Sequence, residues 1–297
     1  MTAPATSTTG SAVASLLGLA ALAAAYGIPY WRRSRTLARA GRPVPRWRQV
    51  CFACGMGSLL VALSPPLDNL SDDLLLGHMA QHLLIGDIAA LLIVLGLTGP
   101  LLAPLLRVRG LGGLRALTHP VVALALWTAD LYIWHLPALY QAALRHPALH
   151  VLEHMMFLSF GVLMWMALLG PLPKPRWFGA LGKLSYGVAV RLVSTVLANI
   201  LFWSGTVFYP YYAAGTRRWD ISQLSDQSAA GSIMMVEGSF LTIGLFAWLF
   251  LRSAREGEER QDLLDAAAAR QVPLSERRAE RAVSAGRGAA LRERLDG

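Results

Sequence analysis

Charged residues are scarce in this chain. Aspartate, glutamate, lysine and arginine make up 15% of its 297 residues, hydrophobic residues make up 55%, and the mean hydropathy is +0.44. Since a soluble domain usually carries about 25% charged residues, this composition predicts an integral membrane protein. The net charge of +9 would suggest a nucleic-acid partner in a soluble protein. In a membrane protein it is explained by basic loops, so we expect membrane lipid and no nucleic acid as a partner.

Cysteine is also scarce, and basic residues are absent from the start of the chain. The two cysteines, Cys51 and Cys54, cannot build a disulfide framework. Residues 1–10 hold no lysine or arginine, whereas a secretory signal has a positive segment before its apolar core. Here the charge follows the core, at Arg32 and Arg33. The first apolar segment is therefore predicted to be a retained helix.

Seven segments are apolar enough to cross a bilayer, which takes roughly 20 mostly apolar residues in a helix. They cover residues 11–31, 50–64, 73–98, 118–139, 148–169, 184–208 and 229–251. The odd-numbered loops and the tail hold 23 of the 27 lysines and arginines, and the even-numbered loops hold three. Because basic loops stay in the cytoplasm, we predict an all-α membrane protein with seven transmembrane helices, its N-terminus outside and its C-terminus cytoplasmic.

This arrangement divides the chain into three parts. They are an extracytoplasmic N-terminus (1–10), a seven-helix membrane domain (11–251) and a charged cytoplasmic tail (252–297). The tail mixes ten arginines with nine acidic residues and is predicted to be an amphipathic helix or a disordered segment. Within the membrane domain, Pro137 should end or kink the fourth segment, because proline donates no N–H and clashes with the preceding turn.

Histidines gather on one side of this predicted bundle. Six of the seven lie at or near the outer ends of three segments, and only His119 belongs to the inner face. The six are His78, His82, His135, His146, His150 and His154. The pairs 78/82 and 150/154 have i, i+4 spacing, which puts both rings of a pair on one helix face. Because imidazole is costly in hydrocarbon without a partner and is the commonest metal ligand, we predict a metal site.

The chemistry of the site depends on which other groups join the imidazoles. Imidazole suits copper, zinc, iron and nickel. Asp226, Asp130 or Glu153 would add a carboxylate ligand or orient an imidazole. Methionine thioethers favour Cu(I), although methionine is also common apolar filler. The methionines nearest the histidines or inside the last segment are Met79, Met155, Met156, Met234 and Met235.

Four short motifs resemble the CtaG family of bacterial cytochrome c oxidase assembly factors, the seven-span membrane kind. They are His78-Met-Ala-Gln-His82-Leu-Leu, Trp134-His135-Leu-Pro137-Ala-Leu-Tyr140, His150-Val-Leu-Glu153-His154, and Asp226-Gln227 followed by Gly231. Together they run from about residue 70 to residue 250. The order of the Trp-His-Leu-Pro and His-x-x-Glu-His elements is the most specific part of the likeness.

The resemblance implies a multi-pass protein of the bacterial plasma membrane that helps copper reach haem-copper oxidase subunits during assembly. Such a protein is an accessory factor without catalytic turnover. By matching position, the metal-site candidates are His78, His82, His135, His150, His154 and Asp226.

Three other functions fit the same residues. A membrane zinc hydrolase would use three histidines and an open water position, but the chain has no His-Glu-x-x-His motif. A b-type haem protein needs one axial histidine from each of two facing helices, and His82 with His154 would serve. A copper transporter would use Asp87, Arg191 and Glu237 as a path inward, because intramembrane ionisable groups face the bundle interior.

Overall fold

The computed structural model describes residues 6–108, 113–284 and 286–296, and its regular structure in these ranges is entirely helical. The elements are α1 (Thr6–Arg39), α2 (Arg46–Ala62), α3 (Pro65–Asp73), α4 (Leu75–Leu83), the π-helical turn η1 (Leu84–Ala89), α5 (Ala90–Gly96), α6 (Gly99–Leu102), η2 (Leu105–Arg107), α7 (Leu114–Leu117), α8 (Pro120–Trp134), α9 (Pro137–Arg145), α10 (Pro147–Leu169), α11 (Ala180–Trp203), η4 (Pro210–Tyr212), α12 (Ala213–Arg218), α13 (Gln223–Ala269), α14 (Glu276–Ser284) and α15 (Gly288–Asp296). Half of the N-terminal part predicted to lie outside, residues 1–5, falls outside the described residues.

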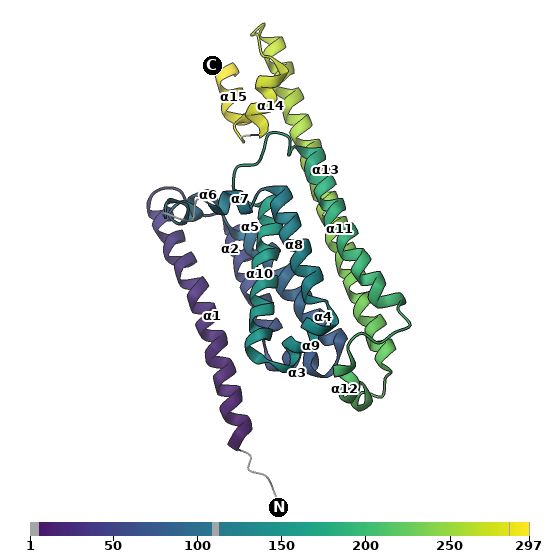
Figure 1. Ribbon diagram of the computed structural model, residues 1–297. Coiled ribbons are helices and arrows are strands. Elements are labelled where there is room, and N and C mark those ends of the chain that lie inside the picture. The colour runs from purple at the N-terminus through teal and green to yellow at the C-terminus, as the bar shows by residue number, and fades with distance from the viewer. Residues whose placement is uncertain (1–5, 109–112, 285, 297) are drawn as a thin grey trace, which may run out of the picture.

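Four helices of the described chain are long and apolar enough to cross a membrane. They are Leu75–Gly96, Pro147–Leu169, Ala180–Trp203 and Gln223–Ala269. The number rises to six if each of two bent pairs, α2 with α3 and α8 with α9, is one span. The long helices run side by side as a bundle, and α1 lies along one edge of it (Figure 1). A helical protein with four to six candidate membrane spans is therefore established, and α1 is not among those candidates.

The third predicted segment is not one uniform helix. It begins as α4, widens into the π-helical turn η1 and continues as α5. A tight crossing fixes this region against α10, because a side chain at Gly161 would collide with the carbonyl oxygen of Gly86. Small residues at such crossings let two helix backbones approach closely. The crossing holds the middle of α10 directly against η1.

Two short helices differ from the sequence prediction. Helix α3 stands where a loop was expected, and α9 includes the expected end of the fourth segment. The stretch at residues 65–72, predicted to be a loop, forms α3, with its prolines in the first turn, where no N–H is required. Pro137 breaks the fourth segment as predicted. There α8 ends at Trp134, and α9 leaves at 73°. As a result α9 lies at the end of the bundle (Figure 1).

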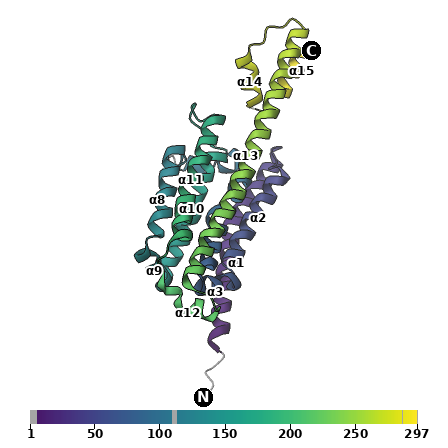
Figure 2. The same ribbon diagram turned by 90° about the vertical axis from the view of Figure 1, so that its right-hand side faces the viewer.

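The C-terminal tail is helical and packed over its described residues. Helix α13 runs for 47 residues to Ala269, well past residue 251, where the last span was predicted to end. Figure 2 shows α13 passing along the whole bundle and carrying α14 and α15 beyond it. A small second core of Leu263, Ala279 and Val283, with Leu291 and Leu295 of α15 packed against it, joins these three helices.

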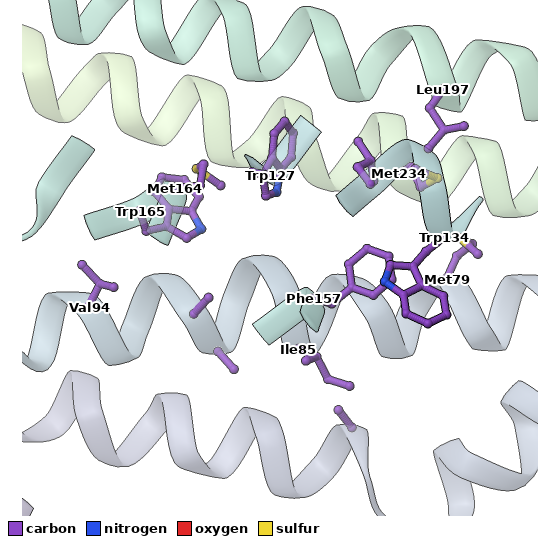
Figure 3. Close-up of a cluster of buried hydrophobic side chains, with 14 of the residues drawn as sticks. Met79, Ile85, Val94, Trp127, Trp134, Phe157, Met164, Trp165, Leu197 and Met234 are labelled. Atoms are coloured by element: carbon purple, nitrogen blue, oxygen red, sulfur yellow. The ribbon is translucent and has the colours of Figure 1, made fainter. Parts of the chain in front are cut away.

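Large side chains fill the interior of the main bundle. Figure 3 shows tryptophans, methionines and Phe157 interlocking between the helices. Trp165 is 4% exposed and Met164 is 1% exposed. Long unbranched methionines fill irregular gaps between such rings. At one end of this packed interior, histidine rings of α4 and α10 contact each other.

Candidate metal centre

Helix α4 presents two histidines to the interior. His78 is 0% exposed and His82 is 5% exposed, and their ring centroids lie 4.2 Å apart, one helical turn from each other. The start of α4 is fixed by Asp226 of α13, whose carboxylate accepts hydrogen bonds from the backbone amides of Leu75 (2.8 Å) and Leu76 (3.0 Å). These amides have no partner within their own helix, so the aspartate both caps and positions α4.

Helix α10 presents the second pair, His150 and His154, whose ring centroids are also 4.2 Å apart. The two pairs face each other. The ring centroids of His78 and His150 are 5.2 Å apart, and those of His82 and His154 are 5.3 Å apart. We call these four residues the histidine cluster. The i, i+4 spacing seen in the sequence thus places four imidazoles together at the end of the bundle where α3, α9 and α12 lie.

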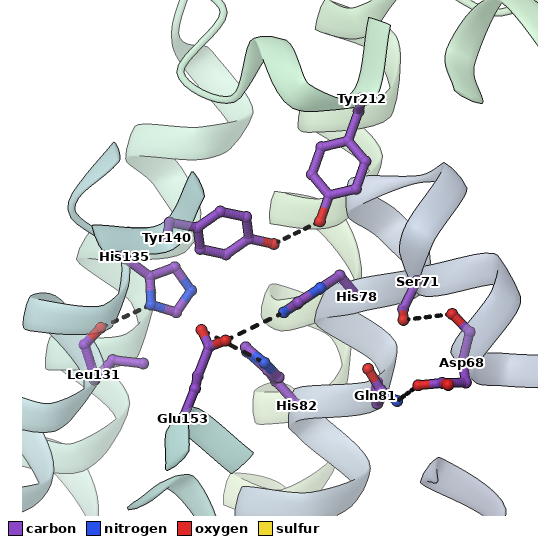
Figure 4. A network of polar contacts seen from close by, with 10 residues as sticks. All are labelled: Asp68, Ser71, His78, Gln81, His82, Leu131, His135, Tyr140, Glu153 and Tyr212. Carbon is purple, nitrogen blue, oxygen red and sulfur yellow. Dashed lines mark hydrogen bonds and ion pairs between the residues drawn. The ribbon is translucent and has the colours of Figure 1, made fainter. Parts of the chain in front are cut away.

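Glu153 lies inside the histidine cluster. Its carboxylate oxygens are 4.0 Å from Nε2 of His78 and 3.8 Å from Nε2 of His82, and the residue is 0% exposed. Figure 4 shows the carboxylate between the two rings. These distances exceed those of a hydrogen bond. Two ligands at about 2 Å from one ion lie up to about 4 Å apart, so the gaps suit a bridging ion.

The ligand atoms form two overlapping groups within the described chain. His78, His150 and His154 make one, and His78, His82 and Glu153 make the other, with ligand atoms in each group within 4.8 Å of one another. His78 belongs to both. An ion could therefore move between two three-ligand sets while keeping one ligand.

The buried ligand atoms lack hydrogen-bond partners among the described residues. Both ring nitrogens of His78 and His82, Nε2 of His150 and His154, and both carboxylate oxygens of Glu153 are in this state. A buried polar atom without a partner costs about 1–3 kcal/mol, and such groups are rare in folded proteins. So many together are explained by an ion or by ordered water that joins them, and the donor set fits a metal.

His135 lies at the edge of this arrangement. Its ring centroid is 6.5 Å from that of His82, and it belongs to neither three-ligand group. Its Nδ1 contacts the carbonyl oxygen of Leu131 at 2.7 Å, whereas its Nε2 is buried without a partner. Metal-binding histidines commonly hydrogen-bond a backbone carbonyl through the second ring nitrogen. His135 is therefore oriented like a metal ligand, but it lies farther from the centre of the cluster than the other four histidines do.

None of the remaining candidates belongs to either three-ligand group, although Asp130 lies close enough to Glu153 to act on it electrostatically. Asp226 caps α4 with both carboxylate oxygens. His146 is exposed between α9 and α10. His119 lies away from the cluster, with its ring 5.9 Å from that of Trp177. Asp130 is 3% exposed and makes no hydrogen bond with its carboxylate among the described residues.

Sequence reasoning named Glu153 as one of three possible carboxylate partners, although it was not among the six matched candidates. It missed Tyr140. Its ring lies 5.1 Å from that of His78, and its hydroxyl shares a 3.0 Å hydrogen bond with the hydroxyl of Tyr212. Its place at the end of the Trp-His-Leu-Pro motif could have indicated this residue from the sequence. In the structure, Tyr140 of α9 packs against the histidine cluster.

The sequence matches the model of the cytochrome c oxidase caa3 assembly factor family, Caa3_CtaG, over residues 12–256. The chain belongs to this family. It is also 27% identical over 236 residues to an uncharacterised protein of Mycobacterium bovis and to one of Mycobacterium tuberculosis. The match covers 74% of this chain but only 35% of each relative, so the chain spans about a third of their length. No solved structure matches it.

Membership of the caa3 assembly factor family agrees with the likeness seen in the four motifs. The matched range contains all of the histidine cluster, together with His135 and Asp226. Most of the charged tail lies beyond it. The matched range therefore contains the helical bundle and the residues of the candidate metal centre.

Proposed function

We propose that this caa3 assembly factor binds copper at the histidine cluster and passes it to a subunit of a haem-copper oxidase. The observation that carries the proposal is the meeting of four imidazoles, two buried and two half-buried, with the Glu153 carboxylate, whose buried ligand atoms have no hydrogen-bond partner among the described residues. Imidazole binds copper well. The family supplies the purpose, because copper is part of the oxidase that is being assembled.

Two overlapping ligand groups suit delivery. An ion that must be handed over has to be held firmly and still be released. An ion held by His78, His150 and His154 can exchange two ligands for His82 and Glu153 without losing His78. His135, with Nε2 unpartnered beside the cluster, would be a further ligand during such an exchange. Stepwise exchange avoids a state in which the ion has no protein ligand.

The proposed orientation places the histidine cluster on the outer side of the bacterial plasma membrane. The start of α1 and the end of α15 lie at opposite ends of the bundle in both views (Figures 1 and 2), as seven spans with the N-terminus outside would require. The cluster lies at the end where α1 begins. Basic loops at the opposite end support a cytoplasmic location for that end. Copper would thus be bound where extracytoplasmic metal is available.

Metal analysis of the purified protein tests this function. The wild type should hold copper in a fixed ratio after loading with Cu(I) and removal of unbound metal. Replacing His78, His82, His150 and His154 by alanine together should abolish loading. His146→Ala is the matched control, because that histidine lies between α9 and α10 and is exposed, and it should load as the wild type does. Unchanged loading of the fourfold variant would refute copper binding at this cluster.

A zinc hydrolase is the other function that this donor set supports. Three histidines with a neighbouring carboxylate can hold zinc and activate water, and His78, His150, His154 and Glu153 have that composition. We favour an accessory role without turnover. Zinc in place of copper in the protein as isolated, together with hydrolysis of a lipid or peptide that Glu153→Gln abolishes, would overturn that choice.

A further inference from the structure

One cavity, which is not fully enclosed, runs from the histidine cluster into the middle of the bundle. Its walls include His82 and His135 at one end and three ionisable side chains, Asp87, Arg191 and Glu237, deeper along the helices. It offers about 80 Å³ to the centres of water-sized molecules, room for several waters. The remaining wall is mostly apolar, with Trp127, Phe157, Met164 and Trp165 among its residues. The cavity thus joins the candidate metal centre to a second polar site.

The π-helical turn η1 carries Asp87 in the wall of this cavity. Asp87 follows His82 by five residues, about 7.5 Å along a helix at 1.5 Å per residue. Single π-helical turns occur frequently at functional sites. This one begins two residues after His82, so one wall of the cavity carries an imidazole followed by a carboxyl group.

Arg191 of α11 and Glu237 of α13 complete the polar site. The Nη2 of Arg191 donates hydrogen bonds to the carbonyl oxygen of Met235 (3.1 Å) and to Oγ of Ser239 (2.8 Å). Its Nη1 and the Oε1 of Glu237 are buried without hydrogen-bond partners in the described structure. Asp87 and Arg191 both lie close enough to Glu237 to act on it electrostatically. The three side chains therefore form one charged group facing one cavity.

The charges of this group do not balance. Two ionised carboxylates against one guanidinium leave a net charge of −1. An uncompensated charge is costly in the interior of a membrane protein, where such groups pair or lie along ion and proton paths. The other charged or titratable groups that line the cavity are His82 from α4 and His135 after α8, and the cavity-facing residues of α10 are apolar. One further positive charge is needed.

We propose that Asp87 and Glu237 share one proton in the metal-free protein, and that this proton leaves when a cation binds at the histidine cluster. A proton suits the site better than copper, because carboxylate oxygens are hard ligands and Cu(I) prefers soft ones. His82 supports the link between the two sites. It is 95% buried, both of its ring nitrogens are unpartnered, and it lines the same cavity.

The linkage follows from electrostatics. A metal ion at the cluster adds positive charge at one end of a cavity with a low dielectric constant, where charges interact strongly over distance. The O–H bond of the protonated carboxyl then breaks, and the proton passes through the cavity water to the solvent. The carboxylate left behind offsets part of the charge of the ion. Proton release on metal binding rests on the proposed metal function, whereas the sharing of one proton in the metal-free protein does not.

Infrared spectroscopy of the full-length protein tests both halves, because a protonated carboxyl group has a C=O band distinct from the bands of a carboxylate. In metal-free protein, Asp87→Asn and Glu237→Gln should each remove the same band, since either variant leaves one carboxylate opposite Arg191 and no need for a proton. A proton that belonged to one residue alone would be lost in only one variant. Glu258→Gln is the control, because that exposed carboxyl of α13 is not among the residues lining the cavity, and it should leave this band in place.

Adding Cu(I) under reducing conditions then tests the linkage. The band should fall in the wild type and in Glu258→Gln as copper loads. A band that is insensitive to both carboxyl variants, or lost in only one, overturns the shared proton. A band that persists in protein shown to hold copper overturns the linkage alone. If no copper loads, the linkage fails together with the proposed metal function, and the shared proton is still decided by the metal-free comparison.

Discussion

The carboxylate of Asp226 accepts hydrogen bonds from the backbone amides of Leu75 and Leu76, joining residues about 150 positions apart in the chain. Both oxygens are occupied by the first turn of α4, three residues before His78. This aspartate matched the family motif and was a candidate metal ligand. Its contacts instead fix the start of α4, the helix that carries His78 and His82.

Asp226→Ala should therefore weaken copper binding without changing its stoichiometry. Loss of a helix cap costs about 0.5–2 kcal/mol, and a loosened α4 would hold His78 and His82 less well. The measurements are thermal unfolding and copper titration of the purified protein. Asp226→Asn keeps one acceptor oxygen. Its unfolding temperature and copper affinity should lie between those of Asp226→Ala and those of the wild type. Complete loss of copper from Asp226→Asn with normal stability would instead identify a ligand.

Glu153→Gln should lower copper affinity by at least 10-fold. The change keeps the size of the side chain and removes the negative charge that lies between His78 and His82. Loss of a group that orients metal ligands typically costs 10–100-fold in affinity, and loss of a ligand costs at least as much. Competition with a Cu(I) chelator measures the affinity. Glu258→Gln, which makes the same change at an exposed glutamate of α13, should bind copper as the wild type does. Equal affinity of Glu153→Gln and wild type would remove Glu153 from the site.

Gly161→Ala should push α10 away from η1. The added methyl group would collide with the carbonyl oxygen of Gly86, and overpacking of this kind typically costs about 1–3 kcal/mol. Since α10 carries His150 and His154, copper affinity should fall together with the unfolding temperature. Gly57→Ala is the matched control, because a methyl group there meets nothing within 4 Å. Normal copper binding by Gly161→Ala would show that the crossing does not position the cluster.

Lys174, in the loop between α10 and α11, should make stability rise with pH. Its amino group donates to the carbonyl oxygen of Met166, and burial, with a smaller effect of Lys183, lowers its pKa to about 8. Between pH of about 8 and the ordinary lysine value of about 10.4, the unfolded chain binds more protons than the folded one. Stability therefore increases across this window as the pH rises.

Thermal unfolding at a series of pH values checks this prediction. Lys174→Met removes the titrating group and should flatten the rise. Arg176→Met alters a neighbouring basic residue of the same loop and serves as the control. A rise that is just as steep in Lys174→Met would assign the effect to other groups.

Much of the helical organisation could be predicted from sequence, because a helix that crosses the hydrocarbon core of a membrane must meet two simple requirements. A span must be long and apolar, and its backbone must satisfy its own hydrogen bonds. Segments 148–169 and 184–208 correspond closely to α10 and α11. The break at Pro137 was also predictable, since it follows from the chemistry of one residue. Contacts between helices are not encoded in this local way, so α3 and the turn η1 were not foreseen.

The candidate site also has some features that local sequence patterns determine and others that depend on contacts between helices. By itself the sequence determined that two i, i+4 histidine pairs lie on helix faces, because helical geometry relates residues four apart. Only the tertiary structure decided that these faces meet around Glu153, that Asp226 caps α4 instead of joining them, and that a cavity links His82 to Asp87 and Glu237. Those facts depend on how α4, α10 and α13 pack against one another. That packing is set by close contacts such as Gly86 against Gly161, which no local pattern in the chain specifies.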